Sequence, residues 1–332
     1  MNESLRRRLV TIPRTLALWV LLTLLFPLLL VLTLGIDLGR WLFSRKPWMA
    51  TRLLVMGWVY LALQAGVIVI AGAQWLASLP FGRAAGKRRT AWAYGLQAWW
   101  VRMLLAAMRA VLGLRFEVSG DAVITPGPIL VLFRHASIVD NVLPHAFITD
   151  RHGIKLRWVL KKELLTDPAL DIGGNRMPNY FVDRSSETPE TERANIAKLG
   201  ADLAADEGVL LFPEGTRFSA ARRAARMTRL AETSPELHDI LEGHDQVLPP
   251  RPGGVLALLD GGMDVVMGVH TGLENMRGLR EIWNTAPIGR TVKLDFRRIP
   301  ASQVPTGTTD RIRWLHEEWA RVGDTIARLR QS

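Results

Sequence analysis

The stretch VLLFPEGTRF, residues 209–218, is an apolar run closed by a proline, with Glu214, Gly215, Thr216 and Arg217 directly after it. A short apolar run bounded by a turn signal predicts a strand buried on both faces, and proline cannot continue a strand ladder. Glycine permits close backbone approach, and the planar guanidinium of arginine suits a phosphate group. The stretch therefore predicts a buried strand followed by an anion-binding turn. An ordinary strand-to-loop turn with a solvated ion pair is the alternative.

A second stretch, FRHASIVDN at residues 133–141, follows the apolar run PILVL and carries His135 and Asp140. A spacing of five places two side chains about 140° apart on a helix, so a continuous helix would separate them. A turn after the strand could bring them together. An imidazole held by a carboxylate is a general base of fixed orientation. The alternative is a surface histidine and a helix-capping aspartate, because short motifs often match by chance.

Two further stretches also place polar groups at strand ends. NYFVDRSS, residues 179–186, ends a strand-like run at Asp183 and Arg184, and residues 248–269 read as a basic, glycine-containing turn, a helix and a strand. In parallel sheets, ligands bind at the carboxyl ends of the strands. The four stretches together predict a base, an acid and several arginines at one sheet edge, which is the usual form of an α/β active site.

The rest of the C-terminal part alternates strand-like and helical patterns. A helix is predicted from the N-cap Thr188 and first-turn Pro189 to Gly208, and a packed helix over residues 309–329. This order predicts an α/β fold with a central, mostly parallel sheet flanked by helices. The strand-like runs are RFEV, ILVLF, RWVL, YFV, VLLF, DVVMGV and VKLDF, and the helix before Gly208 would bury Ile196, Leu199 and Leu203.

The N-terminal part is apolar enough to enter a membrane. Residues 15–36 hold no charge, and such a run can cross a hydrocarbon core of about 30 Å. It is longer than the apolar region of a signal peptide, and no cleavage site follows. Residues 53–82 are also uncharged but contain glutamine, glycine and proline, so this segment could span, kink or re-enter. Eight of the twelve tryptophans fall in residues 1–100, as in interfacial belts.

The charge distribution supports a membrane rather than a nucleic acid as partner. Residues 1–114 carry fourteen basic and two acidic residues, a net +12 against +11 for the whole chain, so the remaining residues carry about −1. Cations beside apolar helices indicate anionic headgroups. The chain has no cysteine, which excludes disulfides, a thiolate nucleophile and cysteine metal ligands.

We therefore predict a membrane-anchoring helical hairpin over residues 1–89 and a catalytic domain over residues 115–332. The cations of the three flanks do not decide the orientation. We place the catalytic domain on the cytoplasmic side of a bacterial inner membrane, because the expected chemistry is there. Residues 90–114 have the pattern of an amphipathic interfacial helix, and a domain core helix fits equally.

Taken in order, the four stretches resemble the blocks of the glycerophospholipid acyltransferase family, typified by 1-acylglycerol-3-phosphate acyltransferase. HASIVD is similar to the family's His-x4-Asp block, YFVDR to its second block, and GGMDVVMGV to its fourth. Residues 212–217 reproduce its Phe-Pro-Glu-Gly-Thr-Arg block letter for letter. The resemblance covers roughly residues 115–275, and the insert of about thirty residues after Arg217 is similar to that of a long-insert branch.

The resemblance implies an O-acyltransferase of phospholipid biosynthesis. His135 would act as base on the free hydroxyl of a lysophospholipid, and Asp140 would orient it. The acceptor would attack an acyl thioester, acyl-CoA or acyl-ACP, without an acyl-enzyme. The first expected acceptor is 1-acylglycerol 3-phosphate, which would give phosphatidic acid. No metal and no cofactor beyond the acyl donor are implied. The acceptor phosphate would be held by Arg217 with Glu214, Gly215 and Thr216, and Arg184 would support it or the donor.

The chain departs from the family pattern at two places. Arg134 stands where the family usually has asparagine and adds a cation that could contact phosphate, and Met267 and Gly268 stand where a proline is common. Another lysophospholipid or an aminoacyl lipid is the alternative acceptor, and a non-catalytic membrane scaffold is the alternative class. A lipid esterase would need a Gly-x-Ser-x-Gly elbow, which this sequence lacks. We assign the histidines His145, His152 and His270 to structural or surface positions.

Overall fold

The computed structural model describes residues 3–183 and 189–331 and groups the chain into two compact units. Unit 1 contains the chain up to Leu114 together with Leu160–Asn179 and Trp283–Gly289. Unit 2 contains Arg115–Val159, Tyr180–Ile282 and the chain from Arg290 onward. The predicted domain boundaries at residues 89 and 114 stay predictions.

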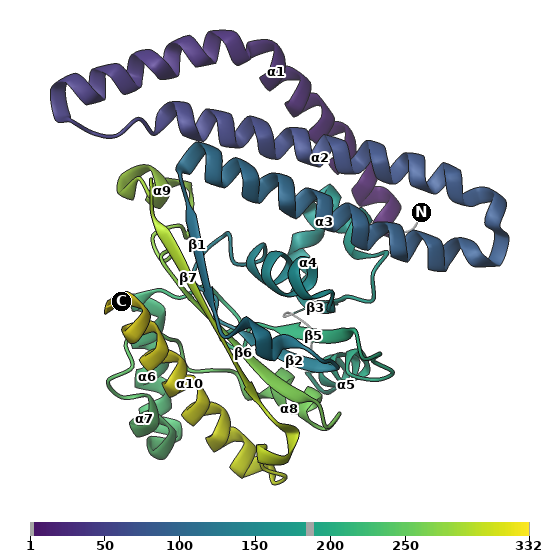
Figure 1. Cartoon of the computed structure of the whole chain (residues 1–332), viewed down its shortest axis with the longest axis vertical. Coiled ribbons are helices and arrows are strands. Elements are labelled where there is room, and N and C mark those ends of the chain that lie inside the picture. Colours follow the sequence, from purple (N-terminus) through teal and green to yellow (C-terminus); the bar gives the residue numbers. More distant parts are fainter. Residues whose placement is uncertain (1–2, 184–188, 332) are drawn as a thin grey trace. The chain divides into compact units, whose positions relative to one another are not determined.

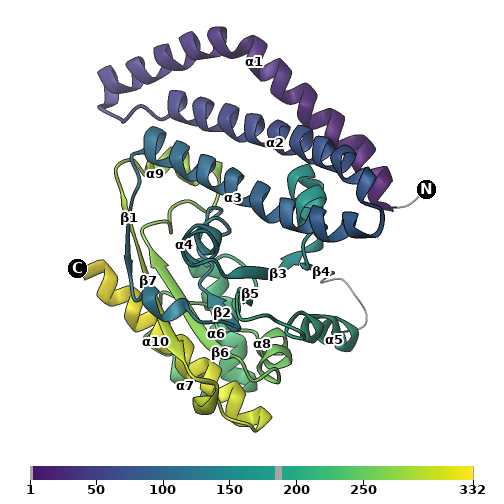
Figure 2. The same ribbon diagram turned by 45° about the vertical axis from the view of Figure 1, so that its right-hand side comes forward.

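Unit 1 is built on three helices that can be followed in Figures 1 and 2, α1 (Glu3–Ser44), α2 (Ala50–Ser78) and α3 (Ala85–Leu112). α2 packs against both α1 and α3. A short 3-10 helix, Leu79–Ala84, joins α2 to α3. By length and composition, α1 and the segment Ala50–Gly82 could each cross a membrane. α1 leaves many large apolar side chains exposed, such as Leu24 and Phe43, and exposed apolar surface of this kind marks a membrane or protein contact.

Two local contacts explain how the helices of unit 1 fit together. The Asp37 carboxylate of α1 is buried and accepts hydrogen bonds from the backbone N–H groups of Met49, Ala50 and Thr51, so it caps the start of α2. At Gly66 of α2, a β-carbon would lie only 2.9 Å from the ring of Trp99 in α3. The glycine therefore allows the close packing of α2 on α3.

Residues 160–179 lie along α2 and the start of α1, within unit 1. Asp167 accepts a hydrogen bond from Tyr60 (2.7 Å), and Arg176 donates to the carbonyl oxygen of Ala71 (2.9 Å). The buried Asp171 carboxylate pairs with two arginines of α1, Arg7 and Arg8, at 2.8 and 2.9 Å. The segment contains two short helical turns, Lys162–Thr166 and Leu170–Gly174.

Unit 2 holds a seven-stranded sheet in the order β1-β7-β6-β2-β5-β3-β4. β2 pairs in parallel with β5 and β6, β3 with β5, and β1 with β7, whereas β6 and β7 are antiparallel. The predicted α/β fold with a mostly parallel sheet is therefore confirmed. The strands are β1 (Arg115–Ser119), β2 (Ile129–Phe133), β3 (Lys155–Lys161), β4 (Tyr180–Val182), β5 (Glu207–Leu211), β6 (Asp264–Thr271) and β7 (Thr291–Ile299).

Burial along the strands follows from their place in the sheet. All five residues of β2 are buried, as expected for a central strand covered on both faces. β1 stands at one edge, and its burial alternates along the strand. Each predicted strand-like run lies within or at the end of one of these strands.

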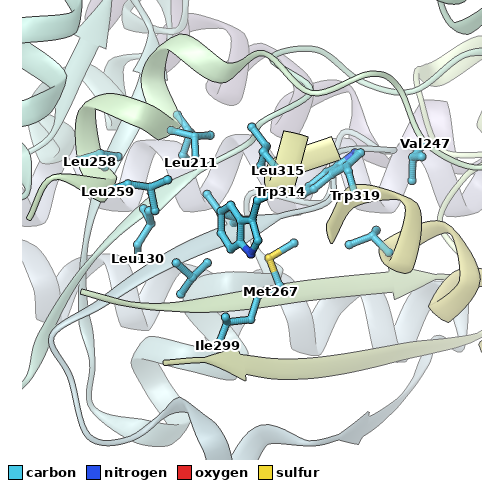
Figure 3. Close-up of a cluster of buried hydrophobic side chains, with 14 of the residues drawn as sticks. Leu130, Leu211, Val247, Leu258, Leu259, Met267, Ile299, Trp314, Leu315 and Trp319 are labelled. Atoms are coloured by element: carbon cyan, nitrogen blue, oxygen red, sulfur yellow. The ribbon is translucent and has the colours of Figure 1, made fainter. Parts of the chain in front are cut away.

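The main core of unit 2 lies between the sheet and helices that include α8 (Pro252–Leu259) and α10 (Thr308–Gln331). Figure 3 shows Trp314, Leu315 and Trp319 of α10 in one cluster with Met267 of β6 and Ile299 of β7, and Trp314 is drawn next to Met267. Buried leucine and tryptophan of this kind stabilise the layer by about 1.5–3 kcal/mol for each side chain. The other helices of unit 2, or shared with unit 1, are Asp121–Ile124, His145–Thr149, α4 (Asp150–His152), α5 (Pro189–Leu199), α6 (Ala220–Thr233), α7 (Pro235–Leu241), α9 (Leu279–Thr285) and Ala301–Gln303.

The sequence predicted a helix that ends at Gly208, and this predicted end was wrong. α5 ends at Leu199, and Gly208 lies inside β5, where a β-carbon would come within 2.7 Å of the Ile129 carbonyl oxygen. The glycine therefore serves strand pairing and not helix termination. The predicted buried residues Ile196 and Leu199 do lie in the core. Thr188, the predicted N-cap, lies outside the described residues.

Candidate active site

The candidate site lies at the carboxyl ends of three neighbouring parallel strands, β6, β2 and β5. β2 lies between the other two, and all three run in the same direction. The sequence between Phe133 and Asp140 follows β2, and the sequence from Phe212 to Phe218 follows β5. His270 is the second-last residue of β6. Strand direction alone therefore brings the motif residues to one edge of the sheet.

His135 and Asp140 form the expected pair. Nδ1 of His135 lies 3.0 Å from Oδ2 of Asp140, and the chain between them forms turns and not a helix. Asp140 is fully buried, whereas the His135 side chain keeps 17% of its surface exposed. Within the described part of the chain, the ring of His135 is engaged through Nδ1 and not through Nε2. The pair thus offers one ring nitrogen to a substrate and anchors the other.

The Asp140 carboxylate is held in its charged form. Burial alone would raise its pKa, but the neighbouring His270 and His135 hold the pKa of Asp140 well below its usual range. Oδ2 also accepts hydrogen bonds from the backbone N–H groups of Ala136 and Ser137. A carboxylate that accepts several backbone N–H bonds is stabilised as the anion. Asp140 is therefore an ionised partner that can stabilise a protonated His135.

The turn after β5 is joined directly to the histidine. The backbone N–H of Phe218 donates to the His135 carbonyl oxygen at 2.7 Å, and the Phe212 ring lies 4.6 Å from the imidazole. Gly215 has a φ of +63°, a conformation that side chains disfavour. Arg217 is half-buried and donates to the Arg277 carbonyl oxygen at 2.8 Å. Arg217 directly precedes Phe218, so the hydrogen bond of Phe218 ties the loop that carries Arg217 to the His135 backbone.

Glu214 points away from solvent. Its side chain is fully buried, and Oε1 accepts hydrogen bonds from the Leu248 backbone (3.2 Å) and the Trp319 indole (3.4 Å). Oε2 has no hydrogen-bond partner among the described residues. Burial raises the pKa of Glu214 to about 7, against the opposing charge of Arg134 and these two hydrogen bonds. In this structure Glu214 supports the turn from inside and does not face the site opening.

Arg134 is likewise buried. Its guanidinium donates to the His270 carbonyl oxygen (2.5 Å), to Oε1 of Glu274 (2.8 Å) and to the Gln246 carbonyl oxygen (3.2 Å). Burial works against the charge of Glu274, but the adjacent Arg134 holds the pKa of Glu274 well below its usual range. A buried arginine that is paired in this way ties loops together. The predicted contact of Arg134 with phosphate stays a prediction, and its burial does not favour it.

The remaining predicted residues are less defined. Gly215 and Thr216 are half-buried in the turn after β5, and Arg184 lies outside the described residues. Sequence reasoning missed His270, whose Nε2 lies 3.2 Å from Oδ1 of Asp140. It also missed Glu274, the partner of Arg134. A buried partner for Asp140 could have been sought on the strand next to β2, but no spacing in the sequence points to it.

One group of side chains in the described part of the chain could meet around a metal ion, and it lies elsewhere. His238, Asp239 and Glu242 belong to α7 or follow it directly, and their ligand atoms lie within 4.8 Å of one another. Two of the three are exposed, and exposed acidic groups of this kind are common without an ion. The expectation that the reaction uses no metal stays a prediction.

Comparisons with known proteins point to acyltransferases. Residues 115–263 match the family model described as Acyltransferase. The chain is 24% identical over 238 residues to lysophosphatidylinositol acyltransferase 10 of Caenorhabditis elegans, a match that covers 67% of this chain and 58% of that protein. It is 33% identical over 119 residues to 1-acyl-sn-glycerol-3-phosphate acyltransferase of Pseudomonas aeruginosa, covering 36% of this chain and 44% of that protein.

A solved structure shares the fold. The crystal structure of the 1-acyl-sn-glycerophosphate acyltransferase PlsC from Thermotoga maritima superposes with a TM-score of 0.54 at 16% identity, covering 85% of this chain and 97% of that one. The chain spans 58% of the length of the curated relative from Caenorhabditis elegans and of lysocardiolipin acyltransferase 1 from Danio rerio. The family-model match over residues 115–263 includes the His135–Asp140 pair and the turn after β5.

Proposed function

We propose that this chain is a glycerophospholipid acyltransferase, which transfers an acyl chain from an acyl thioester to the free hydroxyl of a lysophospholipid. The match of residues 115–263 to the family model described as Acyltransferase supports this proposal. The donor is acyl-CoA or acyl-ACP. The first proposed acceptor is 1-acylglycerol 3-phosphate, which becomes phosphatidic acid. The reaction would serve phospholipid biosynthesis.

The observation that carries this proposal is the contact between Nδ1 of His135 and Oδ2 of Asp140 at 3.0 Å. Asp140 is buried and ionised, while the ring of His135 is partly exposed and, among the described residues, engaged through Nδ1 alone. A histidine held in this way is an effective general base for a hydroxyl group. A scaffold protein has no need of such a pair, so the geometry favours an enzyme.

The reaction follows from the roles of these two side chains. Nε2 of His135 takes the proton of the acceptor hydroxyl as its oxygen attacks the thioester carbonyl carbon. The new ester C–O bond forms, the C–S bond breaks, and the protonated His135 returns its proton to the departing thiolate. Asp140 stabilises the imidazolium throughout. No covalent acyl-enzyme is needed, which agrees with a chain that has no cysteine.

The turn after β5 would bind the acceptor phosphate. Arg217 is partly exposed, and its loop is bonded to the His135 backbone. A guanidinium can bind a phosphate with two parallel hydrogen bonds. We assign Arg217 to the phosphate and Gly215 and Thr216 to the shape of the turn. Glu214 would support the turn from the protein interior, and Arg184 would help to bind the phosphate of the acceptor or the donor.

A second acceptor is favoured by the names of two relatives. The proteins from Caenorhabditis elegans and Danio rerio are named for lysophosphatidylinositol and lysocardiolipin, which carry a phosphodiester in place of a terminal phosphate. The same His135–Asp140 chemistry would acylate such a lipid. The acceptor is therefore the part of the proposal to test first.

The test is thioester-dependent acylation by the purified full chain in detergent. Each acceptor (1-acylglycerol 3-phosphate, other lysophospholipids, glycerol 3-phosphate) is offered with acyl-CoA and with acyl-ACP. The variant His135→Ala is expected to lose activity. The matched control is His152→Ala, which removes a second His–Asp pair, with Nε2 3.2 Å from Asp121, and is expected to stay active.

Each outcome decides a part of the proposal. Product from 1-acylglycerol 3-phosphate that disappears in His135→Ala supports the full proposal. Product from another lysophospholipid alone keeps the chemistry and replaces the acceptor. An absence of product with every acceptor and donor, from protein that is folded, contradicts the enzyme proposal and favours the scaffold.

We further propose that the chain is held at the bacterial inner membrane with its acyltransferase domain in the cytoplasm. The apolar helices α1 and α2 and the basic excess of residues 1–114 support membrane attachment. A lysophospholipid acceptor and its product both reside in a bilayer. An enzyme that acts on them gains from attachment to that surface.

The contacts of α2 favour a helix that stays in one leaflet. Residues 160–179 contact α2 at Tyr60, through Asp167, and at Gln74, through Arg176. These two α2 residues lie about 21 Å apart along the helix at the usual rise per residue. If α2 crossed the bilayer, the polar groups of this segment, such as Asp167 and Asp171, would lie at membrane depth. Polar and ionised groups are costly there.

The cysteine-free sequence allows a direct test of this topology. Two variants are labelled with a membrane-impermeant maleimide in spheroplasts and after lysis: Ser44→Cys, at the end of α1, and Lys87→Cys, near the start of α3. We expect both residues to react only after lysis. If Ser44→Cys reacts in intact spheroplasts while Lys87→Cys does not, the two helices span the membrane.

A further inference from the structure

Asp140 is contacted by histidines on both of its oxygens. Oδ2 faces Nδ1 of His135, and Oδ1 faces Nε2 of His270 at 3.2 Å and the hydroxyl of Ser137. His270 and Asp140 both have zero exposed surface. The two imidazoles therefore flank one buried carboxylate, and only that of His135 reaches solvent.

His270 comes from a different strand than the catalytic pair and is fixed from several sides. It lies in β6, and its ring stacks on Phe133 of β2 with centroids 5.7 Å apart and planes 20° apart. Its carbonyl oxygen accepts a hydrogen bond from Arg134, which is itself paired with Glu274. Neither the backbone nor the ring of His270 can move without disturbing these contacts.

The absence of a side chain at Gly268 makes this stacking possible. Gly268 lies two residues before His270, on the same face of β6, and is paired with Phe133. A β-carbon on Gly268 would come within 2.2 Å of the Phe133 ring. The phenylalanine can therefore cover the glycine and support the imidazole of His270.

A packing role alone does not account for a histidine at this position. A phenylalanine would fill the space and stack equally well, whereas a buried polar ring is costly unless it has a partner. The available partner is Asp140, the residue that orients His135. Neither ring nitrogen makes a hydrogen bond of regular geometry among the described residues, so the approach of Nε2 to Oδ1 of Asp140 at 3.2 Å is an ion-pair contact. Asp140 thus gives His270 its polar function.

On the basis of the proposed acyl transfer, we infer that His270 is a positioning residue for the catalytic pair. Through Nε2 it holds Oδ1 of Asp140, and it thereby keeps Oδ2 directed at Nδ1 of His135. His270 does not touch the substrate and moves no proton in the reaction. It acts on the rate by fixing the plane of the carboxylate.

The inference is tested with His270→Phe and His270→Gln in the full chain. Phenylalanine keeps the stacking but has no N–H group, whereas glutamine has an amide N–H that can reach the carboxylate. For His270→Phe we expect kcat to fall by about 100-fold, the order expected for a small misplacement of a catalytic group. KM should stay unchanged, because substrate contacts are kept. His270→Gln should recover most of the loss.

A spectroscopic measurement reads the same contact without catalysis. The proton shared by His135 and Asp140 gives a downfield proton NMR signal, which is assigned by its loss in His135→Ala. We expect this signal to disappear in His270→Phe and to remain in His270→Gln. The matched control, His152→Phe, removes the separate pair with Asp121 and should change neither kcat nor the signal.

The outcomes separate this inference from the proposed function. Full activity and an unchanged signal in His270→Phe would overturn the inference. If that variant does not fold, His270→Gln is compared with His270→Asn, whose side chain is too short to reach Asp140, and equal kcat and equal signals would overturn it. If the wild type acylates no acceptor, the proposed function fails, while the NMR signals still decide the role of His270.

Discussion

Glu214→Gln is expected to remove a pH-dependent loss of stability. The Glu214 carboxyl is fully buried, and only Oε1 has hydrogen-bond donors, the Leu248 backbone and the Trp319 indole. Burial raises its pKa to about 7, so the folded chain holds it as a neutral acid over most of the acidic range. Glutamine is neutral at every pH and has nearly the same shape, so it mimics the protonated side chain.

The size of the effect follows from the shift. A rise from 4.5 to about 7 corresponds to about 3 kcal/mol at ~1.4 kcal/mol per pKa unit. Between these values the unfolded chain releases the proton while the folded chain keeps it, so stability falls as the pH rises. The stability that the fold has with a neutral Glu214 is fully present below pH 4.5, the pKa of the unfolded state. It is lost once the pH has risen through about 7.

The assay is urea unfolding of the full chain in a non-ionic detergent, followed by tryptophan fluorescence across this pH range. The free energy of unfolding of Glu214→Gln minus that of the wild type should rise by about 3 kcal/mol between about pH 4.5 and pH 8. The control is Glu317→Gln, a glutamate whose side chain is 43% exposed and paired with Arg313, for which the difference should stay flat. A flat difference for Glu214→Gln would refute the reasoning, because the folded chain would then accommodate the anion.

Three further substitutions test other contacts. Gly268→Ala should lower the free energy of unfolding by about 1–3 kcal/mol, since its β-carbon would meet a phenylalanine ring at 2.2 Å; unchanged urea midpoints would contradict the packing. Glu274→Gln should lower the free energy of unfolding by about 3–5 kcal/mol, because it leaves the buried Arg134 guanidinium uncompensated. An equal loss for Arg330→Gln, which removes a more exposed partner of Glu274, would argue against this role. Asp171→Asn should speed limited proteolysis within residues 160–179, as measured by mass spectrometry, because it weakens the pairing with two arginines of α1; an unchanged cleavage rate would count against that docking.

The sheet could be predicted from the sequence because its strands are continuous apolar runs. β2 and β5 are buried along nearly their whole length, and a buried parallel strand has no polar face to confuse the pattern. The position of His135 and the turn after β5 at one edge then follows from strand direction. The approach of His135 to Asp140 followed from a simple geometric argument, because the helix that would separate them is replaced by turns.

The strand neighbours and the buried partners could not be predicted. β6 and β7 are antiparallel, and β1 pairs with β7 across some 170 residues of chain, a choice that depends on tertiary packing. His270 lies inside an apolar strand, where nothing in the local pattern marks it as a partner of Asp140. Glycine also misled the prediction at Gly208, because a close strand approach and a helix end require the same residue.

The orientation of charged residues was equally hidden. Arg134 and Glu214 belong to motifs that suggest contact with a phosphate, yet both side chains are buried in this structure. A sequence pattern marks which residues gather at the end of a strand. Whether each points into the site or beneath it depends on the loop's backbone and on distant elements such as the Trp319 indole of α10.

The docking of residues 160–179 on the N-terminal helices has a consequence for producing this protein. A shortened chain that starts at Arg115 looks attractive, because it removes the apolar helices and keeps the whole sheet. It would also strip Asp167, Asp171 and Ile172 of their partners on α1, α2 and α3. A fragment without the helices would therefore expose unpaired charged and apolar side chains of residues 160–179, which favours aggregation. Preparations should retain the helices or replace residues 160–179 as well.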